Sequence, residues 1–261
     1  MEKRVNPEAK DKNSKSSKKP KTSFKSKLQK SRSKLLGSYY GNPIRDMKLI
    51  CITGSAGKTT VAHFLHEILK VAGQHVAILA SESEIKPSML HKFFADAWKA
   101  GANYVIVTAP AESLKKNVFY GLPVHVAALT NFLDTSLASP TPEEFLKDGG
   151  TLFEMSPEIV ILNSDDIYYS SFSKYTGKNQ TFTYGHDHYS SLKIENSTLY
   201  KRGVEATFSL GSSFFTVGSF LTGEPVISYM ACAAMIATAL HIDTTAIVDG
   251  IANYEPEEEK K

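Results

Sequence analysis

Cysteine, tryptophan and long apolar runs are scarce in this chain of 261 residues, and their scarcity excludes several classes of protein. The two cysteines, Cys51 and Cys232, lie far apart in apolar runs, so we expect reduced core residues rather than a disulfide or a metal pair. No apolar run is long enough to span a membrane, and no apolar signal core follows the basic N-terminus. The sequence therefore predicts a cytoplasmic protein without a transmembrane segment.

Positive charge is concentrated at the N-terminus. Residues 1–34 carry thirteen Lys and Arg against three acidic residues, a net charge of about +10, which leaves about −7 on residues 35–261. Because residues 1–36 hold few large apolar side chains, we predict a disordered basic tail. Two roles stay open for it: contact with a polyanion, either nucleic acid or an anionic surface, or no partner beyond solvent. Residues 255–261 are predicted to form a second, charged tail.

Apolar runs alternate with helical patterns through most of the remaining chain, residues 37–254. Buried strands are predicted from the runs at 49–52, 76–80, 104–107, 124–130 and 159–162. Helices are predicted at 61–71, 89–100 and 141–150, the last ending at Gly149-Gly150. This alternation predicts an α/β fold with a doubly wound, mostly parallel sheet.

The pattern changes after residue 180. Short alternating runs divided by glycine and asparagine predict a small antiparallel β extension, with runs at 181–184, 191–194, 198–201, 206–210 and 214–217. Alanine-rich and apolar segments at 228–240 and 244–251 then predict two helices.

The first predicted strand leads into a small-residue turn and then into a helical pattern. The turn reads Gly54-Ser55-Ala56-Gly57-Lys58-Thr59-Thr60. Glycines allow the backbone to approach a polyphosphate, amide groups and the helix N-terminus face the anion, and lysine and threonine can reach a terminal phosphate and Mg²⁺. The strict phosphate-loop pattern needs glycine where this chain has Ile52, so the turn is a shortened loop. An incidental glycine-rich turn is the alternative, and the flanking strand and helix favour phosphate binding.

The turn resembles the G-T-x-G-K-T-[ST] loop of the Mur ligases and folylpolyglutamate synthetases. Three later segments resemble landmarks of that family in the same order: the Thr-Asn strand end at 128–131, the helix ending in Leu-Phe at 141–153, and V-x-N-x-D-D at 160–166. The resemblance covers about residues 45–252 and implies the central ATP-binding domain of that family.

The resemblance also implies residue roles, with ATP and Mg²⁺ as ligands. Lys58 would be the catalytic residue that holds the β- and γ-phosphates, and Thr59 or Thr60 would bind Mg²⁺. The loop backbone would come from Gly54, Ser55, Ala56 and Gly57, and the nucleotide would also be contacted by Asn131, Asn163 and Asp166.

The family joins a carboxylate to an amine at the expense of ATP, as in the assembly of peptidoglycan precursors. The γ-phosphate passes to the carboxylate, and the amine then displaces phosphate. The substrate-binding domain that precedes the central domain and the ligase domain that follows it have no counterpart in these residues. One expectation is therefore a ligase that works alone or with a partner chain supplying those domains.

Several positions depart from the family pattern. Thr108 occupies the position where the family has a Mg²⁺-binding glutamate. Glu112 occupies the position of the family's histidine four residues later. Residues 132–137 lack the metal-binding histidine of the D-H-x-D segment, and Gly149 replaces the carbamylated lysine, with Lys147 two residues away. Glu112 and Asp134 are substitute ligands only if the backbone shifts. A nucleotide-binding pseudoenzyme or scaffold is therefore the second hypothesis. The third is an unrelated phosphate-loop kinase or synthetase, which the Thr-Asn and Asn-x-Asp-Asp landmarks disfavour.

Overall fold

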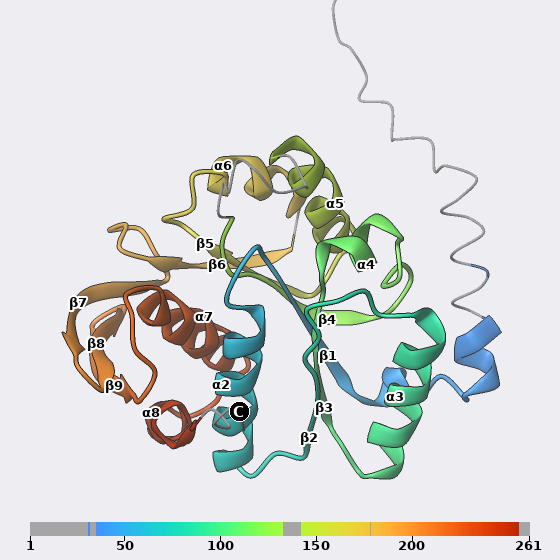
Figure 1. Ribbon diagram of the computed structural model, residues 1–261, viewed down its shortest axis with the longest axis horizontal. Coiled ribbons are helices and arrows are strands. Elements are labelled where there is room, and N and C mark those ends of the chain that lie inside the picture. The colour runs from blue at the N-terminus through green and yellow to red at the C-terminus, as the bar shows by residue number, and fades with distance from the viewer. Residues whose placement is uncertain (1–30, 32–34, 133–141, 178, 256–261) are drawn as a thin grey trace, which may run out of the picture.

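A nine-stranded sheet with the order β2-β3-β1-β4-β5-β6-β7-β8-β9 forms the centre of the molecule (Figure 1). The computed structural model describes residues 31, 35–132, 142–177 and 179–255, so the predictions for residues 1–30, Asp134 and residues 256–261 lie outside the described residues. The strands are β1 (Lys48–Thr53), β2 (Val76–Leu79), β3 (Tyr104–Thr108), β4 (Val124–Leu129), β5 (Ile159–Asn163), β6 (Gln180–Gly185), β7 (Leu192–Tyr200), β8 (Gly203–Leu210) and β9 (Ser213–Ser219). The helices are η1 (Pro43–Asp46), α2 (Lys58–Val71), α3 (Pro87–Lys99), α4 (Ala111–Lys115), α5 (Pro142–Glu154), α6 (Tyr169–Phe172), η2 (Ser173–Tyr175), α7 (Pro225–Ala239) and α8 (Thr244–Asn253).

The pairing confirms a mostly parallel sheet with an antiparallel extension, but the extension is smaller than predicted. All neighbours from β2 to β7 pair in parallel, and the antiparallel pairs are β7 with β8 and β8 with β9. The run at 181–184, predicted to be antiparallel, lies in β6, which is parallel to β5 and to β7. The runs predicted separately at 191–194 and 198–201 form the single strand β7, whose register shifts between Ile194 and Asn196.

Helices cover both faces of the sheet, which confirms the doubly wound arrangement. Alternate residues of a strand point to opposite faces. Ile50 and Ile52 of β1 lie in a core with residues of α2, α7 and α8, whereas Leu49 and Cys51 lie in a second core with residues of α3, α4 and α5 (Figure 1). Both cysteines are buried and free, as predicted. Within the described residues, no helix is long and apolar enough to cross a membrane.

Helix α5 does not end at Gly149-Gly150 as predicted but continues to Glu154. The reason is packing against the aromatic residues that follow β5. A Cβ atom at Gly149 would lie 3.3 Å from the ring of Phe172, and one at Gly150 would lie 2.9 Å from the ring of Tyr175. The two glycines therefore allow close approach inside the helix and do not terminate it.

The contact between α2 and α8 gives a prediction about stability. A Cβ atom at Gly250 of α8 would lie 2.3 Å from the Cα atom of Ile68 in α2. Alanine normally favours a helix over glycine by about 1 kcal/mol, but a backbone clash forces the helices apart. We expect Gly250→Ala to lower the free energy of unfolding by about 1–3 kcal/mol, measured by urea denaturation.

Gly149→Ala is the matched control, because it is also a helical glycine but faces the movable ring of Phe172 at 3.3 Å. It should change stability by less than Gly250→Ala does. Equal effects of the two substitutions would contradict the tight contact between α2 and α8.

Candidate nucleotide site

The turn at residues 54–57 connects β1 to α2 at the carboxyl ends of the parallel strands (Figure 1). Gly54 and Gly57 have φ values of 142° and 78°, which L side chains rarely adopt. A Cβ atom at Gly54 would lie 2.0 Å from the hydroxyl oxygen of Thr130, and one at Gly57 would lie 2.1 Å from the ring of Tyr229. Both glycines are therefore required by backbone conformation and by close packing.

The segment after β4 holds the turn in shape. The carbonyl oxygen of Asn131 accepts a hydrogen bond from the amide of Ser55 (2.9 Å), and its side-chain oxygen accepts one from the amide of Ala56 (3.1 Å). Thr130 donates its hydroxyl to the carbonyl oxygen of Ala56 (2.6 Å). Asn131, predicted as a nucleotide ligand, thus supports the loop itself. The donors that remain for an anion are those at Gly57 and in the first turn of α2, which have no intrahelical acceptors.

The start of α2 carries features that favour an anion. Its N-cap residue is Gly57, which has no side chain to cap the helix, and its first turn contains no acidic residue. Lys58, Thr59 and Thr60 form that turn, and Lys58 is 5% exposed. Unpaired amides and the helix dipole together place positive potential at this end of the helix.

A carboxylate from another loop contacts these side chains. Glu82, which follows β2, lies with one carboxylate oxygen 3.3 Å from Nζ of Lys58, and its other carboxylate oxygen accepts a hydrogen bond from the hydroxyl of Thr59. Nζ of Lys58 also lies 3.4 Å from the carbonyl oxygen of Ser55. Partial burial opposes ionisation of Glu82, but the hydrogen bond from Thr59 and the charge of Lys58 outweigh it and lower the pKa of the carboxyl group.

A further layer of polar residues fixes the segment after β4. Asn163, at the end of β5, donates its side-chain amide to the carbonyl oxygen of Thr130 (3.0 Å), which also accepts a bond from the hydroxyl of Tyr184 (2.6 Å). Asp166 accepts hydrogen bonds from the amides of Phe132 and Tyr168. Burial raises the pKa of Asp166, and those two amides counteract part of the shift. The contacts of Asn163 and Asp166 with a nucleotide stay a prediction.

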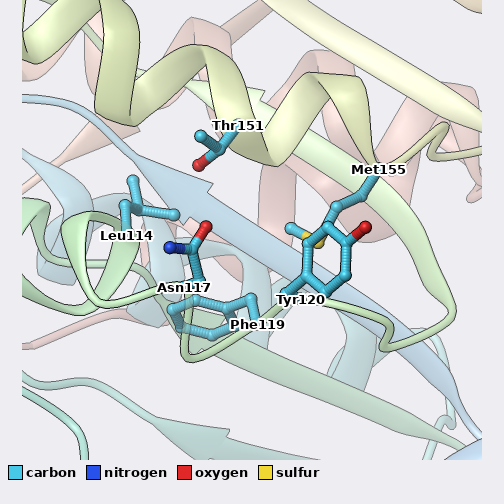
Figure 2. Close-up of a pocket in the computed structure, with 6 residues that line it drawn as sticks. All are labelled: Leu114, Asn117, Phe119, Tyr120, Thr151 and Met155. Carbon is cyan, nitrogen blue, oxygen red and sulfur yellow. The ribbon is translucent and has the colours of Figure 1, made fainter. Parts of the chain in front are cut away.

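Two surface hollows among the described residues lie away from this loop. Figure 2 shows a small one between α4 and α5, where Thr151 and Met155 face Asn117 and Tyr120. Its volume of about 10 Å³ suits one water molecule. A larger hollow of about 300 Å³ is lined by residues of β8, β9 and the end of α8, and by Arg202 in the turn between β7 and β8. Neither of these two hollows is lined by a residue of the turn at 54–57.

The Mur ligase middle domain family matches residues 52–237, which include the turn, the Thr-Asn segment and the end of β5. The chain belongs to this family. The family relationship agrees with the resemblance seen in the sequence and with the mostly parallel sheet that places these segments side by side.

Individual relatives of the Mur ligase middle domain show the same relationship. The UDP-N-acetylmuramoyl-L-alanyl-D-glutamate–2,6-diaminopimelate ligase of Clostridium tetani is 30% identical over 205 residues, covering 73% of this chain and 42% of that protein. The enzyme of that name from Bacillus licheniformis is 27% identical over 243 residues, covering 83% of this chain and 49% of that protein. The chain thus spans less than half the length of these two curated relatives.

Solved structures share the fold at low sequence identity. A UDP-N-acetylmuramoyl-L-alanyl-D-glutamate–2,6-diaminopimelate ligase superposes with a TM-score of 0.80 at 18% identity, covering 90% of this chain and 51% of that chain. The MurF ligase from Thermotoga maritima in complex with ADP superposes with a TM-score of 0.65 at 16% identity, covering 92% of this chain and 56% of that chain.

The positions that depart from the Mur ligase pattern have other roles in this chain. Thr108, fully buried at the end of β3, donates its hydroxyl to the carbonyl oxygen of Ser81 (2.8 Å) and accepts from the amide of Ser81 (2.7 Å). Glu112 is exposed on α4, where its charge acts on Lys116 and Asp148. Gly149 is buried against Phe172, so a lysine there would require that ring to move.

Two residues at the loop were not found from the sequence. Glu82 lies in a Ser-Glu-Ser-Glu turn that matches no motif, and Tyr229 lies in an alanine-rich helix whose pattern indicates only burial. Tyr229 packs on Gly57, and its pKa is raised by burial while a hydrogen bond with Asn131 opposes the shift. Both residues reach the turn because of the strand order and the packing of α7, which local patterns do not encode.

Proposed function

We propose that this chain binds ATP with Mg²⁺ at residues 54–60 and forms the nucleotide-binding part of a Mur-type ligase, which joins a carboxylate to an amine. The observation that carries the proposal is the buried ammonium group of Lys58 at the open N-terminus of α2, beside two glycines whose conformation no other residue adopts easily. The ADP complex of the Thermotoga maritima MurF ligase, which shares this fold, supports a nucleotide as the ligand.

The residues present fit a magnesium nucleotide. Lys58 would neutralise charge on the β- and γ-phosphates, and the amides at the start of α2 would bind phosphate oxygens. The hydroxyl of Thr59 or Thr60 offers the hard oxygen ligand that Mg²⁺ prefers. Mg²⁺ would supply further neutralisation of phosphate charge, and the chain's own part is to position the nucleotide.

The acyl and amino substrates follow from the names of the relatives. The proposed pair is UDP-N-acetylmuramoyl-L-alanyl-D-glutamate and 2,6-diaminopimelate, or close analogues in peptidoglycan assembly. Since the chain covers less than half of these enzymes, the proposal includes a partner chain or further segments that bind these substrates.

A second candidate function is a nucleotide-binding pseudoenzyme or scaffold. The observation that favours it is the replacement of the expected catalytic groups: Thr108 is committed to the backbone of Ser81, and Gly149 is packed under Phe172. This candidate keeps the nucleotide site of the first proposal and omits ligation.

One experiment separates a ligase that works alone from the pseudoenzyme. The full chain is titrated with MgATP by calorimetry, and release of inorganic phosphate is then measured with the muramoyl peptide and diaminopimelate present. We expect saturable ATP binding, and phosphate release that needs both substrates would support the ligase. Binding without phosphate release under any of these conditions would exclude a ligase that works alone and leave the pseudoenzyme and a ligase completed by a partner chain. An absence of ATP binding would overturn both.

A further inference from the structure

We propose that Glu82 is a ligand of the divalent cation that accompanies the nucleotide, and that it exchanges its contacts with Lys58 and Thr59 for that cation when the nucleotide binds. The inference rests on the proposed ATP site and adds a residue to it from outside the loop. No motif or family match assigns Glu82 a role. Its basis is the position of one carboxylate among the described residues.

Glu82 uses both carboxylate oxygens on the two loop side chains best suited to phosphate and metal. One oxygen lies 3.3 Å from Nζ of Lys58, and the other accepts the hydroxyl hydrogen of Thr59. The side chain of Lys58 is 6% exposed, whereas that of Glu82 is 67% exposed. The ammonium group is therefore fixed in the protein while the carboxylate can move without leaving a cavity.

The turn that carries Glu82 is attached to the sheet next to the loop. Thr108, at the end of β3, holds both the amide and the carbonyl oxygen of Ser81, at 2.7 and 2.8 Å. Strand β3 pairs directly with β1, which ends at the loop. On the other side of Glu82, the carboxylate of Glu84 pairs with Lys116 at 2.5 Å. These tethers keep the Glu82 carboxylate beside the start of α2 while its side chain stays free to rotate.

The chemistry of the exchange is favourable on both sides. Mg²⁺ is bound in nucleotide sites by one or two carboxylates, a hydroxyl, phosphate oxygens and water. When the phosphates bind, Lys58 exchanges the carboxylate of Glu82 for phosphate oxygens, so its anionic partner is replaced by another anion. Glu82 then exchanges the ammonium group of Lys58 for Mg²⁺. The hydroxyl of Thr59, which donates to Glu82 in the structure, becomes the neighbouring oxygen ligand of the cation. Each charge keeps a partner of opposite sign.

The test measures ATP affinity of the full chain by calorimetry in excess Mg²⁺ and again in excess EDTA, for wild type, Glu82→Gln and Glu84→Gln. Loss of groups that only orient metal ligands weakens metal binding by about 10–100-fold. We therefore expect Glu82→Gln to weaken ATP binding at least about 10-fold in Mg²⁺. In EDTA the same variant should bind ATP as tightly as wild type or more tightly, because a competing anion is removed from Lys58.

Glu84→Gln is the matched control, since it removes an equal charge from the same turn but from a residue paired with Lys116. It should leave both affinities unchanged. A Glu82→Gln effect that is equal in Mg²⁺ and in EDTA, or no effect in either, would overturn the cation role and leave the ATP site standing. If wild type binds no ATP in Mg²⁺, the proposed function itself fails.

Discussion

Replacing Lys58 with alanine is expected to weaken ATP binding by about two orders of magnitude. A hydrogen bond to a charged group contributes about 1.5–3 kcal/mol, and the upper part of that range corresponds to a factor of about 100. The upper part applies because the lysine is 5% exposed and acts where water is largely excluded. The measurement is calorimetric titration with MgATP, with far-ultraviolet circular dichroism to confirm the fold.

The fold should survive this substitution, because the partners of Lys58 do not depend on it. Glu82 is largely exposed and can be hydrated, and the carbonyl oxygen of Ser55 lies in an exposed residue. Lys70→Ala is the matched control, because it removes one lysine charge from the same helix. The side chain of Lys70 is exposed and pairs with Glu67 at 3.2 Å. Lys70→Ala should bind ATP as wild type does. An unchanged affinity in Lys58→Ala would contradict the assignment of residues 54–60 as a phosphate loop.

The parallel part of the fold was predictable because each of its signals is local. Strands buried on both faces appear as continuous apolar runs, and β1, β3, β4 and β5 lie at the predicted runs with boundaries shifted by about one residue. The loop was predictable for a similar reason: glycines, a lysine and two threonines must follow one another along the chain to surround one anion.

The errors arise where tertiary contacts decide the outcome. Strand β6 alternates in sequence like the strands that follow it, but it pairs in parallel with β5, and strand direction depends on the connection through α6 and η2. The split of β7 into two runs reflects the polar residues Asn196 and Ser197, which are exposed beside the register shift. In α5, the glycine pair indicates a helix end locally, and only the rings of Phe172 and Tyr175 show why glycine is needed there.

The same distinction applies to the candidate site. The sequence predicts which residues of the turn can bind phosphate, but not which side chains approach it from other elements. Glu82 reaches Lys58 because β2 lies two strands from β1 in the sheet, and Tyr229 reaches Gly57 because α7 packs beside α2. These approaches are properties of the strand order, so they appear only when the fold is known.

Gly57→Ala is expected to weaken ATP binding by more than about 10-fold, because two costs act at one position. Alanine at a φ of 78° costs about 1–2 kcal/mol of backbone strain, and its Cβ atom would lie 2.1 Å from the ring of Tyr229. To relieve that clash, either the turn or the ring must move. Tyr229 forms a side-chain hydrogen bond with Asn131, and Asn131 holds the amide of Ala56 in the turn. A displacement of the amides that face the phosphates reduces affinity. Titration with MgATP measures the effect.

Gly73→Ala separates the two costs, because Gly73 follows α2 with a φ of 74° and an added Cβ atom there would meet no other atom within 4 Å. It should lose about 1 kcal/mol of stability by urea denaturation and keep the wild-type affinity for ATP. Adding Tyr229→Ala to Gly57→Ala removes the clash, so the double variant should bind ATP more tightly than Gly57→Ala alone, a coupling that a double-mutant cycle quantifies. Equal ATP affinities of Gly57→Ala and Gly73→Ala would show that the contact with Tyr229 does not shape the loop.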